Sequence, residues 1–140
     1  MSEGEVRAFL TSVPARTAKL ATVRPDGRPH LAPVWYDVDD DGSLVFNTGE
    51  STVKGKNLRH DPRVSLCVDD DRPPFSFVVV EGVAEISDDL DEVGRWAGRL
   101  GGRYMGADRA EEYGSRNGVP GELVVRVRPE RIVSAFDLAD

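Results

Sequence analysis

The segment Gly49–Pro62 contains the residues whose types and spacing best suit a chemical role. Ser51 or Thr52 can cap a helix at its start, and Lys54 and Lys56 follow in the first turn. Cations in that turn oppose the helix dipole, whereas an anion bound at the exposed N–H groups would make them favourable. The arrangement therefore suits a phosphate group. The alternative is a solvated helix with ordinary surface lysines, and this segment alone leaves both open.

A second candidate is the apolar and aromatic run Pro33-Val34-Trp35. Proline has no N–H to donate to a strand ladder, so we expect Pro33 at a sheet edge, at a bulge or beside something other than a strand. A flat ring could stack on this run and form hydrogen bonds with free main-chain groups. The alternative is that Trp35 belongs to the core or to a dimer interface.

Other chemistries have little support in the sequence. His30 and His60 lie far apart, and Cys67 has no companion at a ligand spacing, so no metal site is expected. Cys67 is expected to be a small core residue of its strand. No serine has a nucleophile motif around it, and no glycine-rich nucleotide loop follows a strand. We therefore assign no catalytic side chain.

Composition limits the class of protein. The chain has 140 residues with 25 acidic and 18 basic side chains, a formal charge of −7, which argues against general nucleic-acid binding. No apolar run approaches the ~20 residues of a membrane span. The single cysteine favours a reduced compartment, and the acidic start is unlike a signal peptide. We expect one cytoplasmic domain over residues 1–140, with no membrane or nucleic-acid partner.

Short strands with polar turns dominate the expected structure. Strands and helices do not alternate, so the pattern favours a mainly β fold, a small antiparallel barrel with accessory helices. Helices are expected over Glu3–Val13, within Gly49–Pro62, and over a repeat from Leu90 to Leu100 that Gly101-Gly102 ends. The expected strands are Thr17–Arg24, Pro29–Val38, Leu44–Thr48, Arg63–Asp69, Phe75–Ser87, Glu122–Arg128 and Arg131–Phe136.

Three runs in order along the chain carry a family resemblance: Leu20–Tyr36, Phe46-Asn47-Thr48 and Ser51–Leu66. They resemble the split-barrel flavin and deazaflavin oxidoreductases, the relatives of pyridoxamine 5′-phosphate oxidase. The match covers residues 15–87 well and the later part of the chain less specifically. It implies a six-stranded antiparallel split barrel of the FMN-binding-protein type. It also implies an obligate homodimer with two cofactors at the subunit interface.

The resemblance also implies where the cofactor lies. It puts the phosphate near the start of the Gly49–Pro62 helix and the ring along Ala32–Trp35, in the places that the residues themselves favour. Asn57 is expected to brace the loop. The full set of expected cofactor-binding residues is Ala32, Pro33, Val34, Trp35, Ser51, Thr52, Lys54, Lys56 and Asn57.

Departures from the family pattern indicate the branch. The vitamin oxidases carry an arginine where this chain has Val53 and another within the stretch Leu31-Ala32-Pro33, and their C-terminal Arg/His motif is absent here. The runs Pro33–Tyr36 and Lys54–Arg59 resemble the branch that uses the deazaflavin coenzyme F-420. The resemblance implies hydride transfer from reduced F-420 to a conjugated or unsaturated small molecule. The alternatives are an FMN-binding oxidoreductase, a non-catalytic carrier of a flavin, deazaflavin or tetrapyrrole, and a dimeric domain that has lost its ligand.

Overall fold

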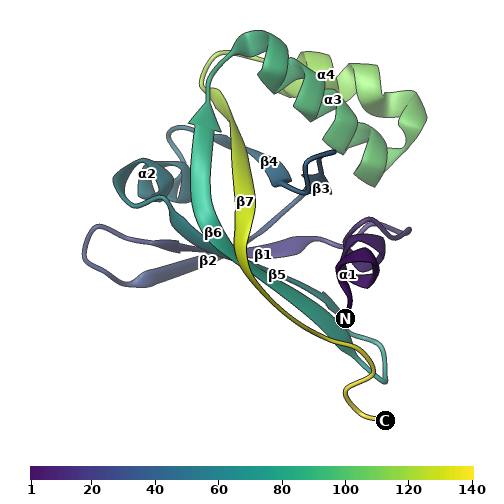
Figure 1. The fold of residues 1–140 in the computed structure, drawn as a ribbon. Helices are drawn as coiled ribbons and strands as arrows, with labels where there is room; N and C mark the ends of the chain where they lie inside the picture. The colour runs from purple at the N-terminus through teal and green to yellow at the C-terminus, as the bar shows by residue number, and fades with distance from the viewer.

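A curled antiparallel sheet of seven strands forms the body of the protein in the computed structural model, which describes all of residues 1–140 (Figure 1). The strand order is β2-β1-β5-β6-β7-β4-β3. The strands are β1 (Ala18–Val23), β2 (Pro29–Val34), β3 (Asp37–Val38), β4 (Leu44–Gly49), β5 (Arg63–Asp70), β6 (Ser76–Ser87) and β7 (Glu122–Ala135). The helices are α1 (Glu3–Leu10), α2 (Val53–His60), α3 (Leu90–Met105) and α4 (Ala110–Asn117), with a 3-10 turn at Ala107–Arg109.

The inner face of the curled sheet holds the main core, a cluster of 19 buried residues. Alternate side chains of the strands enter this core, as the burial patterns of β1 and β5 show. Tyr36 and Phe46 are the largest fully buried residues in it. Helices α3 and α4 pack together at one end of the sheet, while α1 lies below the end of α3 and contacts β3 and β6 (Figure 1). The expected mainly β, antiparallel architecture is confirmed, with seven strands instead of six. No helix has the length and apolarity needed to cross a bilayer.

The strand expected over Pro29–Val38 is interrupted. It divides into β2 and β3 because the backbone leaves the sheet at Trp35 and Tyr36. The N–H of Tyr36 donates to the Tyr104 hydroxyl (3.1 Å) instead of to a neighbouring strand. Strand β2 is an edge strand, and Pro33 lies in it opposite Lys19. Of the three surroundings expected for Pro33, the structure shows the first, a sheet edge.

The last two expected strands form one. Strand β7 continues through Pro129, which lies opposite Gly82, while Arg131 lies opposite Glu81, so Glu130 is the extra residue of a bulge. Gly82 has no room for a side chain there, because a Cβ would lie 2.5 Å from the Arg128 carbonyl oxygen. Strand β4 pairs with β7 only as far as residue 127, so residues 128–135 pair with β6 alone.

Helix α3 does not end at Gly101-Gly102 as expected. It runs to Met105 and ends at Gly106, whose φ of +115° favours glycine. The earlier glycines serve packing instead, because a Cβ on Gly101 would lie 2.3 Å from the Cβ of Tyr113 on α4. Close approach of the two helices thus explains a glycine pair that resembles a stop signal.

Cys67 lies outside the core, contrary to expectation. Its strand alternates, and Val64, Leu66 and Val68 take the inward positions, which leaves Cys67 half-buried on the outer face. Burial, helped by the charge of Asp69, raises the pKa of the Cys67 thiol.

Candidate functional site

A cavity of about 310 Å³ brings the two sequence candidates together. Strand β2, helix α2, helices α3 and α4, and the ends of β4 and β7 all contribute to its wall. Its lining residues are Pro33, Val34, Trp35, Asn47, Lys54, Ala97, Leu100, Asn117 and Glu122. Pro33, Val34 and Trp35 thus face the same space as Lys54. A larger hollow of about 760 Å³ lies between α1 and the sheet, and it contains none of the predicted site residues.

The start of α2 forms as the sequence predicts. Thr52 is the N-cap: its hydroxyl accepts from the N–H of Gly55 (3.1 Å) and donates to the carbonyl of Gly49 (2.7 Å). The first turn contains no acid. The Thr52 hydroxyl is thus engaged within the protein, while Ser51 is exposed beside it.

Lys54 and Lys56 differ in where they lie. Two positions apart on a helix, they point to nearly opposite sides. Lys54 is half-buried and lines the cavity, whereas Lys56 is exposed and lies outside the lining set. Arg59 of α2 and the nearby Arg63, the first residue of β5, already have acidic partners, at 4.0 Å for Arg59–Glu50 and 2.6 Å for Arg63–Asp61. Lys54 is therefore the cation that α2 offers to an anion in the cavity.

Asn57 lies beneath α2, away from the cavity. It is 3% exposed, and its amide donates to the Thr22 hydroxyl on β1 (3.1 Å). The side chain ties the helix to the sheet and so fixes the direction in which Lys54 points. Ala32 is half-buried opposite Leu20 on β1 and also lies outside the lining set. The cofactor contacts predicted for all nine residues, including Pro33, Val34, Trp35 and Lys54, which line the cavity, stay predictions.

Aromatic stacking holds Trp35 in place. Its ring is parallel to that of Tyr104, with centroids 5.1 Å apart and an interplanar angle of 6°, and it meets Tyr113 edge-on at 5.8 Å. The Tyr104 hydroxyl accepts from the N–H of Tyr36 (3.1 Å) and donates to the carbonyl of Arg16 (2.7 Å). Trp35 is half-buried, with one face covered by Tyr104.

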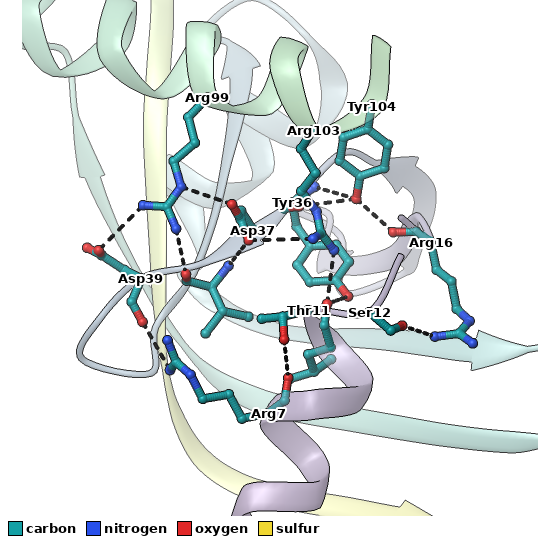
Figure 2. A network of polar contacts seen from close by, with 12 residues as sticks. Arg7, Thr11, Ser12, Arg16, Tyr36, Asp37, Asp39, Arg99, Arg103 and Tyr104 are labelled. Carbon is teal, nitrogen blue, oxygen red and sulfur yellow. Dashed lines mark hydrogen bonds and ion pairs between the residues drawn. The ribbon is translucent and has the colours of Figure 1, made fainter. Parts of the chain in front are cut away.

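A polar network fixes the chain that follows Trp35. Figure 2 shows Arg99 and Arg103 reaching from α3 toward Asp37. The Nε of Arg99 donates to Asp37 (2.9 Å), and a nitrogen of Arg103 donates to the Leu10 carbonyl (2.9 Å), which also accepts from the Tyr36 hydroxyl (2.6 Å). Both α1 and α3 therefore hold the segment that carries the aromatic wall.

Asn47 and Glu122 also line the cavity, and the sequence does not predict either as a site residue. The amide of Asn47 makes a long contact with the Val93 carbonyl (3.5 Å), and its Oδ1 is buried without a partner. Glu122 opens β7 opposite Gly49, and its carboxyl group is half-buried. Burial raises the pKa of Glu122, and the charge of Lys54 partly opposes that shift. Asn47 belongs to one of the runs with a family resemblance and Glu122 to none of the three, and only the fold brings the two residues to Trp35.

The cavity offers a defined set of interactions to a ligand. An aromatic and apolar wall lies on one side of the cavity. Lys54, which has no ion-pair partner, lies on another side, at the start of α2. The Oδ1 of Asn47 is a buried acceptor that receives no hydrogen bond. A flat ring system with polar edges and one anionic group matches this set. Free phosphate alone would leave the wall and the Asn47 acceptor unused.

Comparison with known protein families matches residues 2–135 to pyridoxamine 5′-phosphate oxidase. The chain belongs to this family. The match to the family spans nearly the whole chain, and it agrees with the family resemblance of the three runs.

Individual relatives include two proteins named as reductases and one conserved hypothetical protein. The chain is 28% identical over 123 residues to a 5a,11a-dehydrotetracycline/5a,11a-dehydrooxytetracycline reductase of Streptomyces rimosus, covering 83% of this chain and 71% of the relative. A conserved hypothetical protein of Mycobacterium tuberculosis superposes with a TM-score of 0.82 and 35% identity over 96% of this chain and 84% of its own. An F-420 reductase superposes with a TM-score of 0.66 and 29% identity over 84% and 89%.

Proposed function

We propose that this protein is a deazaflavin-dependent reductase, in which reduced coenzyme F-420 provides a hydride to a conjugated or unsaturated small molecule. The observation that carries the proposal is the shared cavity of Lys54 and the Pro33-Val34-Trp35 wall. The similarity to an F-420 reductase and to a reductase of dehydrotetracyclines supports the cofactor and the reaction type.

The protein's own residues bind and orient. Lys54 pairs with the cofactor phosphate, and the backbone N–H groups of the first turn of α2 face the same anion. Pro33, Val34 and Trp35 form the wall against which the ring lies, and together with Ala97 and Leu100 they keep water from it. When bound, the deazaflavin ring supplies the hydride chemistry.

We also propose that the working form is a homodimer with the cofactor at the subunit interface. Sites for small ligands typically enclose roughly 300–1,000 Å³, and the cavity of about 310 Å³ lies at the lower end of that range. A cofactor together with a substrate needs more enclosure than one chain provides. A second copy supplies the missing wall.

The test is a titration of the purified protein with oxidised F-420 and, separately, with FMN. Quenching of Trp35 and Trp96 fluorescence reports binding, and a Trp35→Phe variant separates the signal of the wall from that of Trp96. We expect tighter binding of F-420. Preference for FMN would assign the protein to the flavin-using part of the family, and binding of neither would overturn the proposal. Light scattering during gel filtration checks the dimer independently.

A further inference from the structure

Glu122 is the cavity residue that the binding roles leave unused. It begins β7, opposite Gly49 of β4, and its side chain shares the cavity with Trp35 and Lys54. One carboxyl oxygen lies beside Gly49, 3.7 Å from where a Cβ on that glycine would be. The residue is half-buried, and its carboxyl group has no hydrogen-bond or ion-pair partner within the chain.

The proposed reaction needs a source of one proton. Hydride addition to a conjugated carbonyl forms a C–H bond at the β-carbon and moves the C=C electron pair toward the carbonyl oxygen. The resulting enolate becomes product only when it gains a proton at the α-carbon. An acid inside the cavity shortens this step, because a positioned group with a suitable pKa commonly accelerates proton transfer by about 100-fold or more.

We propose that Glu122 is the proton donor of this reaction, an inference that rests on the proposed deazaflavin-dependent reduction. The O–H bond of its carboxyl group breaks, a C–H bond forms at the substrate α-carbon, and the enolate electron pair is consumed. The substrate gains one hydride and one proton. The reduced deazaflavin is the hydride donor and is oxidised, and the ring proton that it releases to solvent balances the one that solvent returns to Glu122.

The surroundings of Glu122 favour this role. Lys54 is the charged group that faces it from α2, and Asn117 faces the cavity from α4 without a charge. Glu50, in the turn between β4 and α2, is exposed and pairs with Arg59 (4.0 Å). Burial raises the pKa of Glu122, so more of it carries a proton near neutral pH than of an exposed glutamate. The neighbouring cation limits that shift and stabilises the carboxylate left after proton donation.

The Glu122→Gln variant tests the proposal, and Glu50→Gln, at an exposed glutamate in the neighbouring turn between β4 and α2, is its control. The substrate probe is 2-methylcyclohex-2-en-1-one, whose reduced product is chiral at the carbon that receives the proton. We expect Glu122→Gln to keep the F-420 affinity of the wild type within about twofold, to lower kcat by about 100-fold, and to lose enantiomeric excess in the product. Glu50→Gln should match the wild type in all three.

A second readout needs no turnover. In protein labelled with ¹³C at the glutamate carboxyl carbons, the signal missing from Glu122→Gln identifies Glu122. We expect it to titrate above the ordinary value of 4.5. A wild-type kcat would be expected to fall as the pH rises through that same midpoint.

The outcomes separate the two proposals. Failure of the wild type to bind F-420, or to reduce the enone with bound reduced F-420, overturns the proposed function and this inference with it. Tight binding together with unchanged kcat and enantiomeric excess in Glu122→Gln overturns the inference alone. A parallel loss of F-420 affinity and kcat in Glu122→Gln would make Glu122 a binding residue and would also overturn the inference. A titration midpoint of the Glu122 carboxyl group at or below 4.5 would overturn it as well.

Discussion

The indole ring of Trp35 lies parallel to the phenol ring of Tyr104, 5.1 Å away between centroids. The two residues come from a strand end and from the last turn of α3, so a helix outside the sheet sets the position of the cavity wall. The same tyrosine also binds the backbone at two places, the N–H of Tyr36 directly after the wall and the carbonyl of Arg16 before β1. The Tyr104 side chain therefore both stacks on Trp35 and anchors the backbone.

Tyr104→Phe separates these two functions. The phenyl ring retains the stack on Trp35, but the N–H of Tyr36 and the carbonyl of Arg16 lose their partner. We expect the free energy of unfolding to fall by about 1–2 kcal/mol, measured by urea denaturation. Tyr113→Phe is the matched control: its ring also contacts Trp35, but its hydroxyl makes no hydrogen bond within the chain, so its stability should stay close to the wild type. Equal effects of the two variants would contradict the anchoring role.

Lys54→Ala tests the phosphate contact. A hydrogen bond to a charged group contributes roughly 1.5–3 kcal/mol, so the variant should bind oxidised F-420 about 10- to 100-fold more weakly in the fluorescence titration. Lys56→Ala removes the same charge from the same helix outside the cavity. It should weaken binding only slightly, and a loss as large as that of Lys54→Ala would show that the anion is held by general charge.

The close contact between α3 and α4 at Gly101 and Tyr113 gives a prediction about stability. Gly101→Ala puts a Cβ 2.3 Å from the Cβ of Tyr113, and forcing a methyl group into such a place destabilises by about 1–3 kcal/mol or more. Gly94→Ala on the same helix meets nothing nearer than 3.9 Å, so helix propensity should stabilise it by up to about 1 kcal/mol. Thermal unfolding of the two variants should shift in opposite directions. A rise for Gly101→Ala would mean that the helices are not held at this distance.

Tyr36 predicts a stability change at alkaline pH. Burial raises its pKa above the ordinary value of 10.0, and its hydroxyl donates to the Leu10 carbonyl. Because the folded pKa is the higher one, this contribution is fully present below about pH 10 and is lost as the pH rises above it and the unfolded chain ionises. Unfolding free energies measured between about pH 9 and 11 should fall more steeply for the wild type than for Tyr36→Phe. Parallel curves would contradict the shift.

The periodic parts of the fold could be predicted from the sequence. The strands and α2 follow from alternation and from capping chemistry, and the capping threonine is where the residue types put it. Gly101 and Pro129 could not be interpreted in this way, because glycine and proline have the same local signature whether they end an element or fit a close contact. The position of Tyr113 shows that Gly101 fits a close contact, and the position of Gly82 on β6 shows the same for Pro129.

The candidate site could be predicted in two halves but not as a whole. Lys54 and Trp35 have local signals, namely a cation in a first helical turn and an aromatic residue beside a strand proline. Asn47 and Glu122 have none, since a single amide or carboxylate on a strand is ordinary until the fold sets what it faces. The arginines of α3 had a usable signal: Arg99 and Arg103 are four residues apart, a spacing that puts both on one helix face.

The half of β7 that pairs with β6 alone has a consequence for the homodimer proposed above. An unpaired strand edge is a template on which a foreign strand can add, and residues 128–135 form such an edge. Here Pro129 removes one donor, the bulge at Glu130 interrupts the ladder, and Arg128, Glu130 and Arg131 place charges along its exposed first half. The opening in the barrel is thereby protected against edge-to-edge growth. In the proposed homodimer, the two copies would then meet through side-chain surfaces and not through strand addition at this edge.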